Sequence, residues 1–151
     1  GLRFFTVYGP WGRPDMALFK FTKKILSNKE IEVYNNGKMS RSFTYIDDAI
    51  NILEKIVLKK PKKNYKYNIP FDIVNLGSKT TIKLTSFIKI IEKNLKKKSI
   101  KRFLPLQDGD SLSTKASTKK LKLLCGSEPT TKINKGIKNF INWYKKYYKI
   151  T

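Results

Sequence analysis

Arginine is scarce in this chain, and its few positions are where specific recognition chemistry is most expected. Of 33 basic residues, only Arg3, Arg13, Arg41 and Arg102 are arginine. Lysine carries the positive charge everywhere else, so a retained arginine suggests a site that uses the planar guanidinium fork. Such a fork matches two oxygens of a carboxylate or a phosphate at once. The sequence therefore favours recognition of an anionic ligand at one or more of these positions.

Arg13 stands in a loop whose place in the chain suits a ligand site. The apolar run 2–8 is rich in aromatic and β-branched residues and predicts a strand. Gly9-Pro10 ends that strand, and the irregular segment up to Met16 carries an arginine and an aspartate. A buried strand that ends in such a loop is the usual carboxyl-edge arrangement of an open α/β sheet, where ligands bind. A plain surface loop is the alternative that these residues leave open.

Other kinds of catalytic centre lack the residues they need. The chain has no histidine and a single cysteine, Cys125, which excludes a zinc-type cluster and an internal disulfide. Its eight glycines never form the GxGxxG or GxxGxxG spacing that cradles a dinucleotide pyrophosphate. Tyr34 and Lys38 match the Tyr-x-x-x-Lys spacing of a catalytic pair, which requires both side chains on one face of a helix. Asn36-Gly37 predicts a turn between them, so they do not share such a face. We therefore predict no catalytic, cofactor-binding or metal-binding residue in this chain.

Five segments, taken in order along the chain, carry a resemblance to a known family. They are RFFTVYGPWGRPDMALFKFTK, GKMSRSFTYIDDA, VNLGS, LPLQDGD and NFINWYKKYY. With them the chain resembles the nucleotide-sugar epimerases of the extended short-chain dehydrogenase/reductase family, and specifically the UDP-glucuronate 4-epimerase branch. The resemblance extends over nearly the whole chain, but it covers only the second part of the family's sequence.

The resemblance implies an α/β fold that is the carboxyl-terminal portion of an extended Rossmann-type enzyme. Residues 1–151 would form a single substrate-binding portion. Strands 2–8 and 72–76 would be two orphaned strands of the parallel dinucleotide-binding sheet, and the other elements would form a small α/β region. The chain opens on Gly1 rather than methionine, directly before an apolar strand, so we expect a piece of a longer protein. The strands' bare edges would favour aggregation or docking onto another chain.

The implied activity is the NAD-dependent conversion of UDP-glucuronate to UDP-galacturonate through a 4-keto intermediate. NAD is expected in the full-length parent, whereas this chain alone is expected to bind none and to be inactive. By the resemblance, Arg13 and Thr6 hold the uronate carboxylate and Arg41 binds the diphosphate. Gln107 and Asp110 would lie near the nucleotide ribose.

Three alternatives stay open. The chain could be a non-catalytic module that pairs with a separate amino-terminal half, or it could belong to a related nucleotide-sugar dehydratase or decarboxylase. The family usually places an aspartate directly after the diphosphate-binding arginine, where this chain has Ser42. The third alternative, a basic nucleic-acid binder, rests on the net charge of +22.

Composition argues against the nucleic-acid alternative and against a membrane protein. The lysines recur along every predicted helix instead of gathering in one patch, and no nucleic-acid motif accompanies them. We therefore expect nonspecific, salt-sensitive adhesion to polyanions rather than specific nucleic-acid binding. There is no apolar run near 18 residues and no signal-like start, so a cytoplasmic protein is expected.

The elements that must position these residues can be predicted from apolar spacing and turn signals. Helices are expected over 17–28, from Asp47 or Asp48 to about 57, from a Thr85 cap to 95, from 117 or 118 to a Gly126 cap, and from about 131 onward. Strands are expected over 31–35 and 39–46, joined as a hairpin at Asn36-Gly37, and over 72–76 and 100–104. Residues 59–70 are rich in Lys, Pro and Asn and predict a mobile surface loop.

Overall fold

Short strands pair two by two in residues 1–60 and 68–150, the part of the chain that the computed structural model describes. Three of the pairs are parallel and one is antiparallel. The parallel pairs are β1 (Leu2–Phe4) with β6 (Val74–Leu76), β2 (Thr6–Tyr8) with β5 (Phe43–Tyr45), and β3 (Ile31–Val33) with β8 (Lys101–Phe103); β4 (Ser40–Arg41) runs antiparallel to β7 (Ile82–Lys83). Parallel pairing between segments far apart in sequence is typical of α/β folds.

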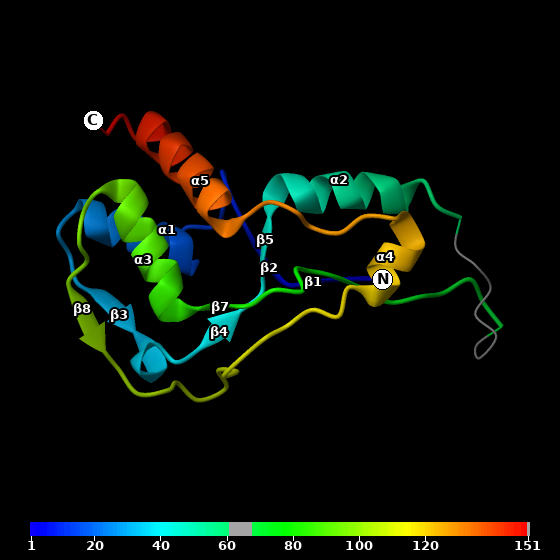
Figure 1. The fold of residues 1–151 in the computed structure, drawn as a ribbon, viewed down its shortest axis with the longest axis horizontal. Coiled ribbons are helices and arrows are strands. Elements are labelled where there is room, and N and C mark those ends of the chain that lie inside the picture. Colours follow the sequence, from blue (N-terminus) through cyan, green and yellow to red (C-terminus); the bar gives the residue numbers. More distant parts are fainter. Residues whose placement is uncertain (61–67, 151) are drawn as a thin grey trace.

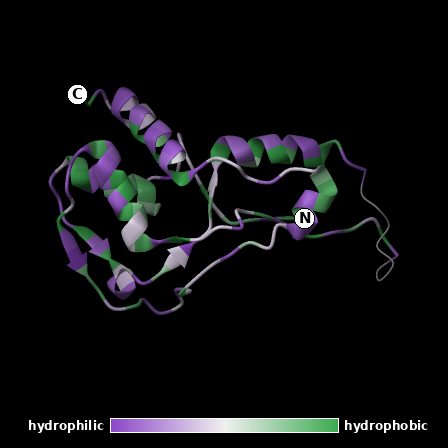
Figure 2. Ribbon diagram, viewed as in Figure 1, coloured by the Kyte–Doolittle hydropathy of each residue, from purple (hydrophilic) through white to green (hydrophobic). Residues whose placement is uncertain are grey.

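Helices cover these strand pairs at both ends of an elongated molecule (Figure 1). They are α1 (Ala17–Leu26), α2 (Ile46–Val57), α3 (Leu84–Leu95), α4 (Lys119–Cys125) and α5 (Ile133–Tyr147), with a 3-10 turn, η1, at Tyr34–Gly37. Hydrophilic and hydrophobic residues alternate in bands along α2, α3 and α5 (Figure 2), as expected for helices with one buried face.

Two hydrophobic cores hold the molecule together. The larger lies among α1, α3, α5 and the β3 strand, where Ile25, Ile31, Phe87 and Phe140 are almost completely buried. The smaller lies between α2, α4 and the β1–β6 pair, and it consists of Ala49, Ile52, Val74, Leu76 and Leu121. Tyr8 at the end of β2 belongs to the larger core, so the loop that follows it starts from a fixed point.

The predicted helices are confirmed, and in α1, α3 and α5 the apolar spacing reports which face is buried. In α2 the buried residues are Ala49 and Ile52, whereas the apolar Ile50 and Val57 are exposed. Leu18, Phe21 and Ile25 are the buried face of α1, as the spacing predicted. The helix predicted after Asp47 or Asp48 begins at Ile46 and carries both acids in its first turn. Four of the five residues predicted for the inner face of α5 are buried: Ile137, Phe140, Ile141 and Tyr144.

The helix ends follow the sequence only in part. Gly126 caps α4 in the left-handed conformation (φ 67°), as predicted. Thr85, however, was predicted as the cap of α3 and instead lies inside that helix, whose cap is Lys83 with no side-chain hydrogen bond. The short β7 strand runs directly into α3 and leaves no turn in which a threonine could cap.

The predicted hairpin around Asn36-Gly37 is wrong. Asn35 and Asn36 do adopt left-handed conformations, with φ of 47° and 49°, so a tight turn is present. The strands on either side do not pair with each other, because β3 pairs with β8 and β4 pairs with β7. The turn's amide groups donate to the segment after β8, from Asn35 N to Pro105 O and from Asn36 N to Leu104 O. Burial of β3 against a distant strand therefore overrides the local hairpin signal.

The predicted strand 2–8 is two strands with different partners. The chain leaves β6 at Phe5, whose amide donates to Leu76 O, and joins β5 from Thr6 onward. The predicted loop 59–70 falls largely on residues 61–67, which lie outside the described residues. Within the described part of the chain, no helix combines the length and the apolar character that a membrane span requires.

Candidate functional site

The loop between β2 and α1 is built on two unusual backbone positions. Gly9 has φ of +147°, and a Cβ atom there would meet the Ile46 side chain at 2.5 Å, so only glycine fits. Trp11 is left-handed at φ 62°, which is uncommon for a bulky residue. Its ring is 73% exposed, yet it lies against Trp143 at 5.2 Å and Tyr147 at 5.1 Å between ring centroids. These contacts fix the loop onto α5.

Thr6 and Arg13 line the same small hollow, at the base of this loop. The hollow has a volume of about 50 Å³, and its other lining residues are mostly apolar, among them Tyr8, Phe43 and Phe140. Complete ligand pockets measure about 300–1,000 Å³, so this hollow is the size of one functional group of a ligand. The structure thus brings together the two residues predicted to hold a carboxylate. Arg41 does not line this hollow.

The guanidinium of Arg13 is occupied by Asp15. Nε donates to Oδ1 at 3.1 Å and Nη2 donates to Oδ2 at 2.5 Å, which is a two-point contact. The hydrogen bond from Arg13 holds the pKa of the Asp15 carboxyl below its ordinary value. The side chains of Arg13 and Asp15 are 76% and 55% exposed, so water screens the pair. Sequence reasoning did not single out Asp15, although its place two residues after Arg13 was the available signal.

Arg41 and Asp110, both predicted as UDP-sugar contacts, also meet. The Nη2 atom of Arg41 lies 3.4 Å from Oδ1 of Asp110, and Nη1 donates to Ser40 O at 3.0 Å. The Arg41 side chain is only 23% exposed. Gln107 lies in the same exposed turn, where its carbonyl accepts the Asp110 amide at 3.2 Å. A partly buried arginine held by an acid is a fixed positive charge that suits phosphate oxygens.

Ser42, which stands where the family usually has aspartate, has a structural role here. It is completely buried, and its hydroxyl donates to the Ser78 carbonyl at 2.5 Å. This bond ties the start of β5 to the turn after β6. The carboxylate beside Arg41 is that of Asp110, from a segment nearly seventy residues away.

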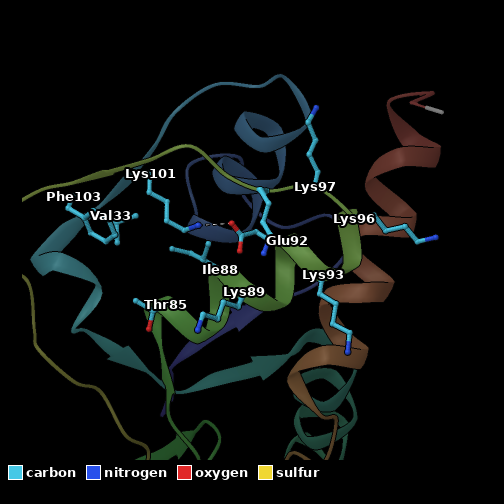
Figure 3. Close-up of a pocket in the computed structure, with 11 residues that line it drawn as sticks. Val33, Thr85, Ile88, Lys89, Glu92, Lys93, Lys96, Lys97, Lys101 and Phe103 are labelled. Atoms are coloured by element: carbon cyan, nitrogen blue, oxygen red, sulfur yellow. Dashed lines mark hydrogen bonds and ion pairs between the residues drawn. The ribbon is translucent and has the colours of Figure 1, made fainter.

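A larger hollow, of about 720 Å³, lies elsewhere, between α3 and β8 (Figure 3). Its walls carry several lysines, but Lys93, Lys96 and Lys97 point in different directions rather than toward one centre (Figure 3). Its one carboxylate, Glu92, accepts hydrogen bonds from Lys101 at 2.6 Å and from the Ser99 amide and hydroxyl. Burial opposes this charge, but the bonds from Lys101 and Ser99 prevail and lower the pKa of Glu92 to about 2. Because its polar groups do not converge, this hollow is a weaker candidate.

The hydroxyl of Tyr8, at the end of β2 beside the loop, is not ionised. Burial raises the pKa of the Tyr8 hydroxyl far above its ordinary value, so this group stays protonated at neutral pH. Tyr34 and Lys38 are separated by the left-handed residues of η1, in agreement with the expectation that they share no helical face. No group of side chains suited to a metal ion occurs among the described residues.

Several known proteins are similar to this chain. A family model described as the NAD dependent epimerase/dehydratase family matches residues 1–70. The chain is 42% identical to Protein CapI of Staphylococcus aureus, covering 99% of this chain and 48% of that protein. It is 38% identical to the probable UDP-glucuronate 4-epimerase of Rhizobium meliloti, covering 97% and 46%. The chain therefore spans about half the length of the curated relatives it matches.

A solved structure is similar as well. The UDP-glucuronic acid 4-epimerase of Bacillus cereus, in complex with UDP-glucuronic acid and NAD, superposes with a TM-score of 0.86 at 33% identity. The match covers 97% of this chain and 45% of that one. The α/β fold described above is accordingly part of the extended Rossmann-type fold of the short-chain dehydrogenase/reductase epimerases.

Proposed function

The chain belongs to the NAD-dependent epimerase/dehydratase family, and we propose that it supplies the UDP-uronate contacts of a nucleotide-sugar 4-epimerase. The parent enzyme would convert UDP-glucuronate to UDP-galacturonate with bound NAD. The observation that carries this proposal is that Thr6 and Arg13, whose side chains end in a hydroxyl and a guanidinium, line one hollow of carboxylate size. A carboxylate accepts hydrogen bonds from both groups.

One ligand can reach both arginines. Thr6 lies opposite Phe43 in the β2–β5 register, and Arg41 lies two residues before Phe43 along the chain. Two residues span at most about 7 Å, so Arg41 stays near the start of β2. We assign Arg13 and Thr6 to the uronate carboxylate and Arg41 to the diphosphate. Asp110 and Gln107, in the turn beside Arg41, would contact the ribose hydroxyls.

The part of the chain that the structure describes does not fit NAD. A dinucleotide pyrophosphate requires a glycine-rich turn that leads into a helix amino end. The α2 helix follows β5 without any turn, and its first turn carries Asp47 and Asp48, which repel an anion. The loop before α1 has only two glycines, Gly9 and Gly12, and Trp11 between them packs against Trp143 and Tyr147 of α5. We therefore propose that NAD binds to another part of the parent protein and that this chain alone has no turnover.

The β1–β6 pair supports this division. Each of its strands has one partner among the described residues, so each keeps an open edge. Phe4 and Ile73 at this pair are about half exposed. We propose that β1 and β6 continue the dinucleotide-binding sheet, whose remaining strands come from the NAD-binding half of the parent or from a separate chain. A related dehydratase or decarboxylase would use the same sheet and the same diphosphate contact.

Binding of two sugar nucleotides tests the carboxylate role. UDP-glucuronate carries a carboxylate at C6, where UDP-glucose carries a hydroxymethyl group. The ratio of their two dissociation constants therefore measures the contribution of the carboxylate contact. We expect R13A to weaken UDP-glucuronate by about tenfold or more, the worth of a charged hydrogen bond, and to leave UDP-glucose nearly unchanged. R102A is the matched control, since Arg102 is also exposed and ion-paired, with Glu30 and Glu32. Equal weakening of both ligands by R13A would exclude the assignment.

Turnover provides the second test. The purified chain is incubated with NAD and UDP-glucuronate, and the products are separated by chromatography. No UDP-galacturonate is expected. Its formation would show that the chain holds a complete catalytic site, contrary to the proposal.

A further inference from the structure

The guanidinium proposed to bind substrate already holds a carboxylate. Asp15 makes two-point contact with Arg13 through both of its carboxylate oxygens, at 3.1 and 2.5 Å. A uronate carboxylate would use the same two N–H groups with the same geometry. Asp15 and an acidic sugar therefore compete for one fork, and they cannot both occupy it.

Local chain geometry makes this contact easy to form. Only Pro14 separates the two residues, and proline restricts the backbone there to φ near −65°. The Met16 amide donates to the Arg13 carbonyl at 3.1 Å and closes the turn. The internal carboxylate is thus presented to Arg13 by the chain itself, at little conformational cost.

The same contact is easy to break. The side chains of Arg13 and Asp15 are mostly exposed, and exposed ion pairs contribute little because water competes for both partners. Lys20, in the first turns of α1, also acts on the Asp15 carboxyl and helps to keep its pKa low. A displaced Asp15 therefore keeps a positive neighbour and remains ionised at neutral pH.

We propose that Asp15 is an internal competitor of the substrate: its carboxylate holds the Arg13 fork until the carboxylate of an acidic sugar nucleotide displaces it. This inference rests on the proposed function. A neutral sugar nucleotide offers no carboxylate and gains nothing from opening the pair. Asp15 thereby weakens binding of the uronate, by a free energy equal to that of the Arg13–Asp15 ion pair. It also prevents a free guanidinium from binding small anions.

Substitution of Asp15 by asparagine tests the proposal. D15N keeps the size of the side chain and removes its charge. UDP-glucuronate is expected to bind about two- to fivefold tighter to D15N than to the unmodified chain, the factor expected for an exposed ion pair. UDP-glucose affinity is expected to stay unchanged. E30Q is the matched control, because Glu30 pairs with Arg102 at 3.1 Å in a similarly exposed position and should affect neither ligand.

The arginine side chains provide a direct readout. With four arginines in the chain, Nε–Hε signals in an ¹⁵N NMR spectrum are few enough to assign by substitution. The chemical shift of the Arg13 Nε–Hε signal should differ between D15N and the unmodified chain. In D15N it should change again on addition of UDP-glucuronate but not of UDP-glucose. The ligand dependence reports on the Arg13 contact with the uronate, and the shift caused by D15N reports that Asp15 holds the fork.

The outcomes separate the inference from the function on which it rests. If R13A abolishes discrimination but D15N binds UDP-glucuronate no tighter, the function stands and the role of Asp15 is wrong. If D15N binds UDP-glucuronate and UDP-glucose more tightly by the same factor, the change in net charge explains the effect, and the proposal is also wrong. If neither ligand binds, or R13A weakens both equally, the proposed function itself is wrong.

Discussion

Substitution of Glu92 by glutamine is expected to destabilise the chain in a pH-dependent way. Glu92 is nearly buried and accepts bonds from Lys101 and from two groups of Ser99. These bonds lower its pKa from 4.5 to about 2. Because the folded pKa lies below the unfolded one, this stabilisation is complete above pH 4.5 and is lost as the pH falls toward 2.

The size of the effect follows from the shift. A pKa lowered by this amount corresponds to at most about 3 kcal/mol of stability at neutral pH. The Lys101 side chain is 30% exposed, so water screens the main partner. We therefore expect E92Q to lower the free energy of unfolding by about 1–3 kcal/mol at pH 7. The difference from the unmodified chain should shrink between pH 4.5 and pH 3.

Urea denaturation at pH 7 and pH 3 measures this difference. E30Q serves as the control, since Glu30 is exposed and pairs with Arg102 at the surface. It should change stability by less than about 1 kcal/mol at either pH. The free energies of unfolding of E92Q and the unmodified chain could also differ by the same amount at both pH values. That result would show that packing, and not charge, explains the loss of stability.

Three further substitutions test the framework around the loop. G136A would drive a Cβ atom into the Tyr8 hydroxyl, and we expect about 1–3 kcal/mol lower stability in thermal unfolding, whereas an unchanged melting temperature would contradict the packing. D48A removes the acceptor of bonds from Thr131 N and Oγ1, and a loss of about 1.5–3 kcal/mol in urea denaturation is expected, with a smaller loss counting against the contact. W11A should release the loop from α5, seen as faster exchange of the Arg13 Nε–Hε proton; an unaltered rate would show that the aromatic contacts do not hold the loop.

Helices could be predicted from the sequence because their signal is local. The spacing of Phe87, Ile88, Ile91 and Leu95 defines one face of α3, and all four are buried. Strand partners could not be predicted in the same way. Ile31 and Val33 are fully buried, but only because β3 pairs with residues about seventy positions away. Nothing in residues 31–46 indicates that distant partner, whereas Asn36-Gly37 indicates a nearby one.

In the candidate site, too, the residue types could be interpreted from the sequence, but the contacts between distant residues could not. Arginines retained in a lysine-rich chain pointed to Arg13 and Arg41, and the structure gives each of them a carboxylate partner. The pairing of Arg41 with Asp110 could not be predicted from the sequence, whereas Asp15 lies only two residues after Arg13. Asp110 was assigned to a ribose and meets Arg41 through the fold, while Asp15 meets Arg13 through a turn closed by backbone hydrogen bonds.

The change of strand partner at Phe5 connects the sugar contacts to the proposed docking edge. Residues before Phe5 pair with β6 and residues after it pair with β5. Thr6 is therefore the first residue beyond the β1–β6 pair, and it lines the hollow with Arg13. A sheet completed against β1 and β6 would end beside Thr6, which would bring whatever the proposed other half binds next to the proposed uronate contact. Because the two contacts adjoin along one short stretch of backbone, docking of that half and binding of the sugar should each favour the other.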